Sequence, residues 1–214
     1  MRKVLRQGAV ALAFCFGMTT EALAIEHSKR ESLDVKYAGG SYNEVVAVNG
    51  TLVSQNKVPL RGLDVDLMVH RRFLYLSYGL VGRQRMMTTP TGTVSFTGAG
   101  ASIGFVTNTF EDPQRWPVGL HAHLCAVVGG ISKVSGAYKQ DSITAFSDGE
   151  LGADLLLHGW KTPDGKRYKS ALVATVGVSG EATGVSLSTR DVKPLSGSMT
   201  ARGKVTKFGL SWYW

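Results

Sequence analysis

Apolar and polar residues alternate along most of this chain. Between residues 63 and 70 the odd positions are all aliphatic, and the even positions hold Asp64, Asp66, Met68 and His70. Successive side chains of a β-strand point to opposite faces, so this period of two predicts a strand with one aliphatic face. Further strands are predicted for residues 73–82, 93–105, 120–127, 151–160 and 168–178. No stretch of useful length has a helical period, so the pattern predicts an all-β fold.

The number of strands depends on how the weaker segments are joined. Residues 33–37, 44–48 and 184–189 are short strand candidates. Turn signals separate the segments at Asn49–Gly50, 89–92, 110–117, 162–165 and 179–182, and Arg71 with Arg72 forms a tight hairpin turn. The longest irregular stretch is residues 132–150. These signals predict eight strands, or ten if the weak segments are separate.

The polar faces of these strands suit the inside of a membrane barrel. They are rich in Gly, Ser, Asp and His rather than in the Lys and Glu of a solvated exterior. A membrane barrel turns its apolar face outward and its polar face inward. Aromatic residues near the strand ends suit interfacial belts, although packing at sheet edges also explains them: Phe73, Tyr75, Phe110, Trp116, Trp160, Tyr168, Trp212 and Trp214. The pattern favours an up-and-down antiparallel transmembrane β-barrel.

The first residues carry an export signal. Arg2, Lys3 and Arg6 precede a short apolar run that ends in an Ala-x-Ala pattern at Ala24. This order predicts a secretory signal peptide over residues 1–24, and it leaves one barrel domain over residues 25–214. No apolar run is long enough for a membrane helix. Cys125 is the single cysteine after the signal, so no intrachain disulfide is expected.

The last strand ends on an aromatic residue. Phe208, Leu210, Trp212 and Trp214 share one face, whereas Tyr213 lies on the other. This ending resembles the C-terminal strand of Gram-negative outer-membrane β-barrel proteins, which the barrel-assembly machinery reads. The resemblance implies a place in the cell outer membrane, with that machinery and outer-membrane lipids, including lipopolysaccharide, as partners. The alternatives are a fimbrial subunit, whose phase would need an apolar face at Tyr213, and a soluble β-sandwich.

Histidines and aspartates gather on the predicted inner faces. They are Asp64, Asp66, His70, His121, His123, Asp154 and His158. A structural polar plug is the favoured interpretation, and a metal site or an acid–base site is the alternative. We expect no metal, because sequence spacing places no third ligand beside His121 and His123, and we expect no other cofactor. No nucleophile motif of a known lipid-modifying barrel is present, which favours a protein that is not an enzyme.

The formal net charge of the chain is +8. An export signal and scattered charges argue against nucleic acid as a partner. Six cations are predicted to flank strands, where they meet either water or lipopolysaccharide phosphates: Arg71, Arg72, Arg83, Arg85, Lys166 and Arg167.

The predicted function is structural: an envelope-integrity or surface-interaction role for a small barrel. A lipid-modifying barrel enzyme, a narrow channel and a soluble periplasmic β-sandwich that binds a ligand remain as alternatives.

Overall fold

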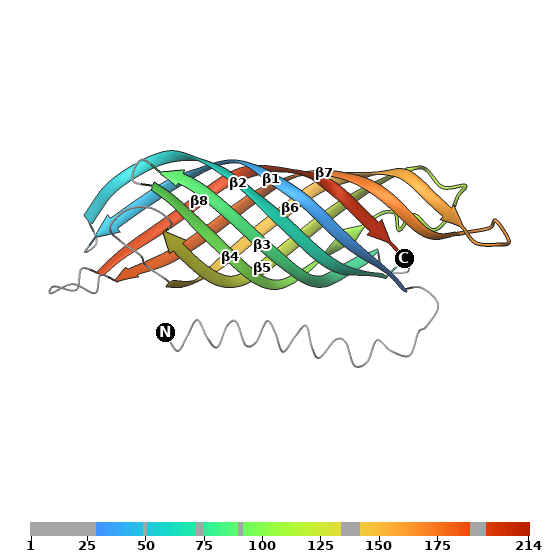
Figure 1. Ribbon diagram of the computed structural model, residues 1–214, viewed down its shortest axis with the longest axis horizontal. Coiled ribbons are helices and arrows are strands. Elements are labelled where there is room, and N and C mark those ends of the chain that lie inside the picture. Colours follow the sequence, from blue (N-terminus) through green and yellow to red (C-terminus); the bar gives the residue numbers. More distant parts are fainter. Residues whose placement is uncertain (1–28, 49–50, 72–74, 90–91, 134–141, 189–195) are drawn as a thin grey trace.

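The described residues form eight strands that run up and down around a barrel (Figure 1). The computed structural model describes residues 29–48, 51–71, 75–89, 92–133, 142–188 and 196–214. The strands are β1 (Lys29–Val48), β2 (Thr51–Arg71), β3 (Leu76–Thr89), β4 (Gly92–Val106), β5 (Val118–Lys133), β6 (Ser142–Lys161), β7 (Tyr168–Ser188) and β8 (Ser196–Tyr213). This confirms the smaller of the two predicted strand numbers, because the weak segments belong to β1 and β7.

Every strand pairs antiparallel with its sequence neighbours, and β1 pairs with β8 to close the ring. The register places Leu33 opposite Trp212 and Ser32 opposite Tyr213, so both ends of the barrel chain meet at one rim. We call this rim the terminal end and the opposite rim the distal end. The connections β2–β3, β4–β5 and β6–β7 lie at the terminal end. A closed ring satisfies every strand edge, which a bilayer requires.

One predicted turn and most of the predicted irregular stretch are strand. Gly180 pairs with Gly149 and Lys204 inside β7, so the turn predicted at residues 179–182 is wrong. Most of the irregular stretch 132–150 is also strand, because β6 begins at Ser142. The predicted signal peptide, residues 1–24, lies outside the described residues, as do Arg72 and Phe73.

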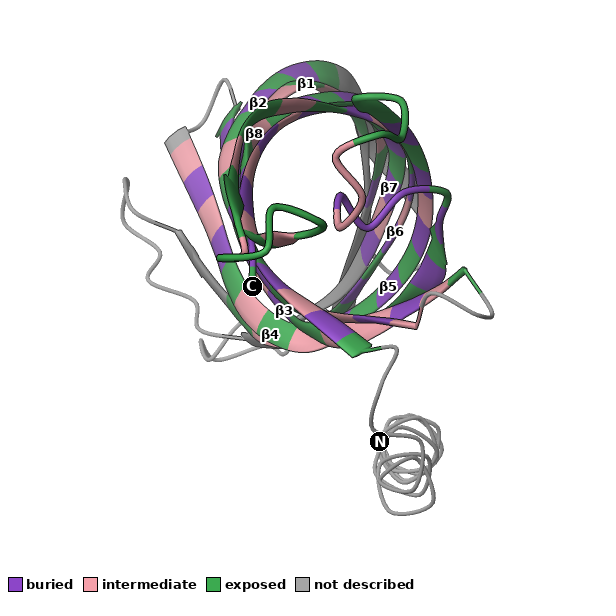
Figure 2. Cartoon of the chain, turned by 90° about the vertical axis from the view of Figure 1, so that its right-hand side faces the viewer, coloured by how far each residue is buried: buried purple, intermediate pink, exposed green. Residues whose placement is uncertain are grey.

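Around the middle of the barrel and toward the terminal end, the outer surface is apolar and the inner face is largely polar. Exposed aliphatic and aromatic side chains include Leu33 and Val35 on β1, Val65 and Leu67 on β2, and the row of β8 that ends in Trp214. The buried and exposed residues alternate along each strand, as the bands in Figure 2 show. This is the inverse of a soluble barrel. Among the described residues no helix is long and apolar enough to cross a membrane.

Aromatic side chains gather outside the terminal end. Trp160 and Trp212 lie 4.7 Å apart between ring centroids, and Trp116 and Trp214 are also exposed. These positions suit an interfacial belt. Phe110 differs from the expectation for that belt, because it is buried inside the barrel.

Candidate functional site

Charged side chains fill the middle of the lumen. Nine buried charged residues of the described chain meet there: Lys36, Asp64, Asp66, Arg83, Arg85, Asp148, Glu150, Glu181 and Lys207. Each lies on the strand face opposite an outward row, so alternation aims it inward. Buried charges are tolerated only when they are paired, and these nine pair with one another.

Lys207 on β8 lies at the centre of this network. Its Nζ is 3.0 Å from Asp64 Oδ2, 3.1 Å from Asp148 Oδ2 and 3.2 Å from Glu150 Oε2. Lys36 Nζ lies 2.9 Å from the other oxygen of Glu150. The two lysines therefore tie β1, β2, β6 and β8 together across the lumen.

Arg85 on β3 spans the barrel to Glu181 on β7. Its Nε donates to Glu181 Oε2 at 2.9 Å and its Nη2 donates to Oε1 at 2.6 Å. Nη1 also donates to Asp64, and Tyr42 donates its hydroxyl proton to Glu181. Two parallel hydrogen bonds between a guanidinium and a carboxylate are among the strongest polar contacts in proteins.

Arg83 makes a second crossing one step along the same strand face. Its Nε donates to Asp148 Oδ2 at 3.0 Å, and its Nη1 donates to Asp66. Its Nη2 lies 3.2 Å from the sulfur of Cys125. The prediction that Arg83 and Arg85 flank a strand and face solvent or lipid is wrong. With Leu80 pointing outward, the period of two places both arginines on the inner face.

The predicted histidine cluster lies beside this network, toward the terminal end. His121 Nδ1 is 3.0 Å from Asp154 Oδ2, and its Nε2 is 3.2 Å from Glu150 Oε1. Both ring nitrogens therefore face carboxylate oxygens, which are hydrogen-bond acceptors when ionised. His123 stacks on it at 5.3 Å between centroids. Gly152 leaves room for the His121 ring, because a Cβ there would overlap it.

His70 lines the same part of the lumen. Its Nε2 lies 2.9 Å from Ser32 Oγ, and its ring stacks on Tyr213 at 5.0 Å. A cavity of about 10 Å³ lies among these groups, and such a space is near the size of one water molecule. His70 Nδ1, His123 Nε2, Asp34 Oδ1 and Thr175 Oγ1 are buried without a hydrogen-bond partner in the described part. A water in the cavity would satisfy such groups.

The structure brings together six of the seven predicted lumen residues. Asp64, Asp66, His70, His121, His123 and Asp154 are all buried. Within the described residues, no three His, Cys, Asp or Glu side chains lie close enough to hold one metal ion.

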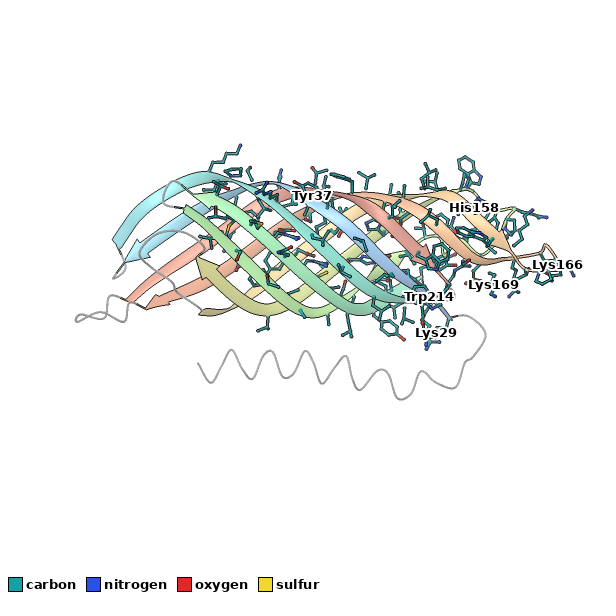
Figure 3. All side chains as sticks on the ribbon, in the orientation of Figure 1. Lys29, Tyr37, His158, Lys166, Lys169 and Trp214 are labelled. Carbon is teal, nitrogen blue, oxygen red and sulfur yellow. The ribbon has the colours of Figure 1, made fainter. Side chains whose placement is uncertain are left out.

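His158 is the exception, and its predicted lumen position is wrong. The register between β6 and β7 shifts between Leu156 and His158, so Leu157 is an extra residue. A bulge of one residue moves the following side chains to the other face. His158 is therefore exposed outside, with its ring 4.4 Å from that of Trp160 (Figure 3).

An apolar layer covers the charge network on its distal side. Phe96 and Phe146 stack at 5.3 Å, and the Arg85 guanidinium carbon lies 5.5 Å from the centre of the Phe146 ring. The layer also contains Tyr42, Val58, Leu60, Met87, Val94, Val127 and Val205. Low-dielectric packing strengthens the ion pairs beneath it.

The β4–β5 connection closes the terminal end. The Asn108 side chain donates to the Trp116 carbonyl at 2.8 Å and accepts from the Phe110 amide at 2.8 Å. Phe110 has a φ of 52°, and its ring packs against Tyr213 at 5.5 Å. A left-handed backbone costs free energy in a residue with a side chain, so the surrounding contacts hold it. Figure 2 views this end and shows connecting segments that reach over part of the opening, one of them with a buried stretch.

The side chains of the closing strand, β8, face the directions that the sequence predicts. Phe208, Leu210, Trp212 and Trp214 are exposed on the outer face, whereas Tyr213 is buried in the lumen. The same strand carries Lys207 into the charge network.

Comparisons with solved structures match this architecture to outer-membrane proteins. The outer-membrane protein OprG from Pseudomonas aeruginosa has a TM-score of 0.51 and 10% identity, over 87% of this chain and 96% of that one. Neisserial surface protein A has a TM-score of 0.42 and 10% identity, over 82% of this chain and 95% of that one. The attachment invasion locus protein Ail of Yersinia pestis has a TM-score of 0.36 and 15% identity, over 85% of this chain and 99% of that one. No family model and no curated protein matches the chain.

The fold is that of a small outer-membrane β-barrel. This shared fold and the apolar outer surface are consistent with the predicted location in the cell outer membrane. The lumen of this barrel is occupied by its own side chains at three levels: the terminal closure, the charge network and the distal apolar layer.

Proposed function

We propose that this protein is a closed, structural outer-membrane barrel with a role in envelope integrity or surface interaction. The filled lumen is the observation that carries the proposal. Lys207 and its three carboxylates lie in the middle of the barrel, with an apolar layer on one side and Phe110 on the other. An eight-stranded barrel is narrow enough for side chains to fill it.

The terminal end faces the periplasm in this proposal. An even number of strands brings both ends of the barrel to one side, and outer-membrane barrels have their termini in the periplasm. The distal end then reaches the outer leaflet. Residues 1–24 direct export, and the outward row from Phe208 to Trp214 is presented to the barrel-assembly machinery.

A lipid-modifying enzyme is the alternative that one contact could favour. Ser32 and His70 have the spacing of a nucleophile and its base. However, Ser32 is 0% exposed, and the Phe110–Tyr213 contact lies at the mouth of the lumen beside His70. This burial separates the hydroxyl from the lipid-facing surface, so we assign the pair a structural role.

Conductance in planar bilayers tests the closed barrel. The refolded protein is expected to give no ion-conducting steps, and a stable open level in the wild type would contradict the proposal. In cells, removal of the protein is expected to raise the uptake of a dye that the intact outer membrane excludes. Complementation by the Ser32→Ala variant is expected to restore exclusion fully, and its failure while the variant is folded would favour the enzyme.

A further inference from the structure

The outer wall becomes cationic toward the distal end. Lys57 and Arg61 on β2 are exposed there, as are Arg202 and Lys204 on β8. We call these four residues the cationic patch. Among the described side chains of this half of the barrel, no carboxylate points outward, because Asp34, Asp64, Asp66, Asp148, Glu150 and Glu181 are all buried in the lumen.

The four cations form two pairs on either side of β1. Asn43 is opposite both Lys57 and Arg202, and Ser41 is opposite Lys204. Two strand spacings separate the pairs, which is about 10 Å along the wall. Gly39, Ser41 and Asn43 form the floor between them, so no large side chain separates the pairs.

None of the four makes an ion pair within the described part of the chain. The lumen acids are engaged with Lys36, Arg83, Arg85 and Lys207. Unpaired cations are costly beside lipid tails and favourable beside anionic headgroups. Anions from outside the protein would therefore stabilise the cationic patch.

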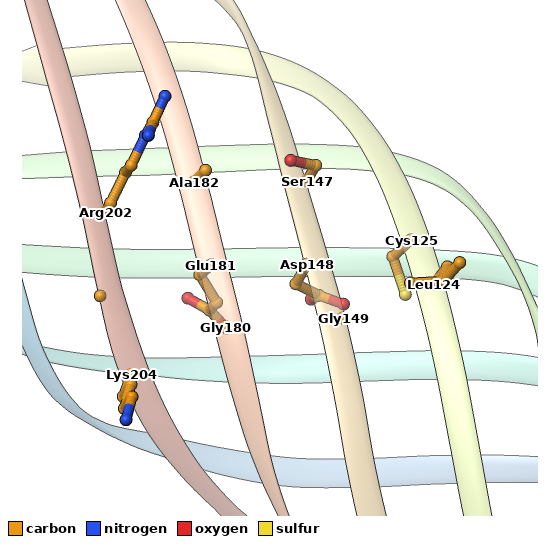
Figure 4. A pocket seen from close by; sticks show the side chains of 11 residues that line it. Leu124, Cys125, Ser147, Asp148, Gly149, Gly180, Glu181, Ala182, Arg202 and Lys204 are labelled. Carbon is orange, nitrogen blue, oxygen red and sulfur yellow. The ribbon is translucent and has the colours of Figure 1, made fainter.

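A groove adjoins the cationic patch on the same wall. Ser147 and Gly149 of β6 and Gly180 and Ala182 of β7 form its floor. Leu124 lies along one side, and Arg202 and Lys204 lie along the other (Figure 4). The hollow is open to the outside of the wall and has a volume of about 580 Å³.

The groove is an interruption of the apolar wall. Leu151 and Val178 are exposed one step nearer the terminal end, whereas Gly180 presents no side chain. A Cβ built on Gly180 would meet no atom within 4 Å. A flexible apolar chain can therefore enter the hollow without displacing any protein atom.

We propose that the groove and the cationic patch form a binding site for lipopolysaccharide. An acyl chain lies in the groove, one phosphate lies between Arg202 and Lys204, and a second phosphate meets Lys57 and Arg61. Two separate cation pairs match a lipid with two phosphate groups better than a phospholipid with one. The inference rests on the orientation in the proposed function, because the distal end must reach the outer leaflet.

Binding of purified lipopolysaccharide to the detergent-folded protein tests the site. The double variant Arg202→Gln, Lys204→Gln is expected to weaken binding at least tenfold, and Gly180→Phe is expected to weaken it by filling the groove. Affinity is also expected to fall as salt is added, because phosphate contacts are screened. Unchanged affinity in both variants would overturn the proposal.

Matched controls separate the site from general effects. Gly130→Phe adds the same ring at an exposed glycine of β5, where a Cβ also meets no atom within 4 Å. Lys166→Gln with Arg167→Gln removes two exposed cations at the terminal end. Both controls are expected to bind like the wild type. Heat-modifiable gel mobility verifies that each variant is folded, and losses equal to those of the site variants would contradict the site.

Two further measurements identify the occupant. Phosphatidylglycerol and dephosphorylated lipopolysaccharide are expected to bind at least tenfold more weakly than intact lipopolysaccharide, and equal binding would overturn the assignment. Cross-linking of a second copy through the groove would overturn it as well. If the lipopolysaccharide test fails but the wild-type barrel does not conduct, the proposed function still stands. Conductance of the wild type instead contradicts that function, whatever the lipid result.

Discussion

Arg85 and Glu181 form a bidentate ion pair across the lumen, between strands that are not neighbours in the barrel. The two hydrogen bonds are 2.9 and 2.6 Å long. Closure of the ring alone would leave β3 and β7 in contact only through the strands between them. This pair joins them directly and sets the boundary between the charge network and the apolar layer.

Removal of one partner of this pair is expected to destabilise the barrel strongly. The Arg85→Gln variant leaves Glu181 and Asp64 short of a cation, and breaking a buried pair typically costs about 3–5 kcal/mol. Urea unfolding in liposomes measures the change in the free energy of unfolding. The double variant Arg85→Met, Glu181→Met is expected to lose less than the sum of the single variants Arg85→Met and Glu181→Met, and additive losses would contradict direct coupling.

The two histidines on opposite faces are expected to respond differently to the same substitution. His121→Gln removes a donor to Asp154 or to Glu150 inside the lumen, and an unsatisfied buried group costs about 1–3 kcal/mol. His158→Gln is expected to change the free energy of unfolding by less than about 0.5 kcal/mol, as is usual for exposed positions. Equal losses would place His158 in the lumen after all.

The terminal closure is expected to depend on Phe110 rather than on the exposed ring nearby. Phe110→Ala removes a buried ring from the cluster with Tyr213, and such a truncation typically costs about 3–5 kcal/mol. Trp116→Ala, at an 81% exposed position, serves as the control and is expected to cost far less. The same unfolding measurement decides between them, and a reversed order would show that the closure is held by other contacts.

Assembly is expected to distinguish the two last residues. Trp214→Asp places a charge on the outer face and removes the terminal aromatic ring, so we expect little folded protein in the outer membrane. Tyr213→Phe keeps a ring in the lumen and is expected to assemble normally. Heat-modifiable mobility of membrane fractions gives the folded share of each. Equal assembly of the two variants would count against the outward row as the assembly signal.

The sequence by itself determined the faces of the strands. A period of two needs no knowledge of partners, so the inward positions of Asp64, Asp66 and His70 and the outward row that ends at Trp214 followed from local alternation. The inverted polarity of the barrel followed from the same pattern, because the residue types on each face reveal which solvent it meets.

Only the tertiary structure decided where the alternation shifts and which side chains meet. The bulge at Leu157 turns His158 outward, and a bulge depends on pairing with β7 rather than on local residues. Alternation alone places Arg83 and Arg85 on the inner face, but their pairing with Asp148 and Glu181 depends on how distant strands meet. Phe110 is buried because its connection folds back over the opening. These outcomes depend on contacts between residues far apart in the chain, which local patterns do not encode.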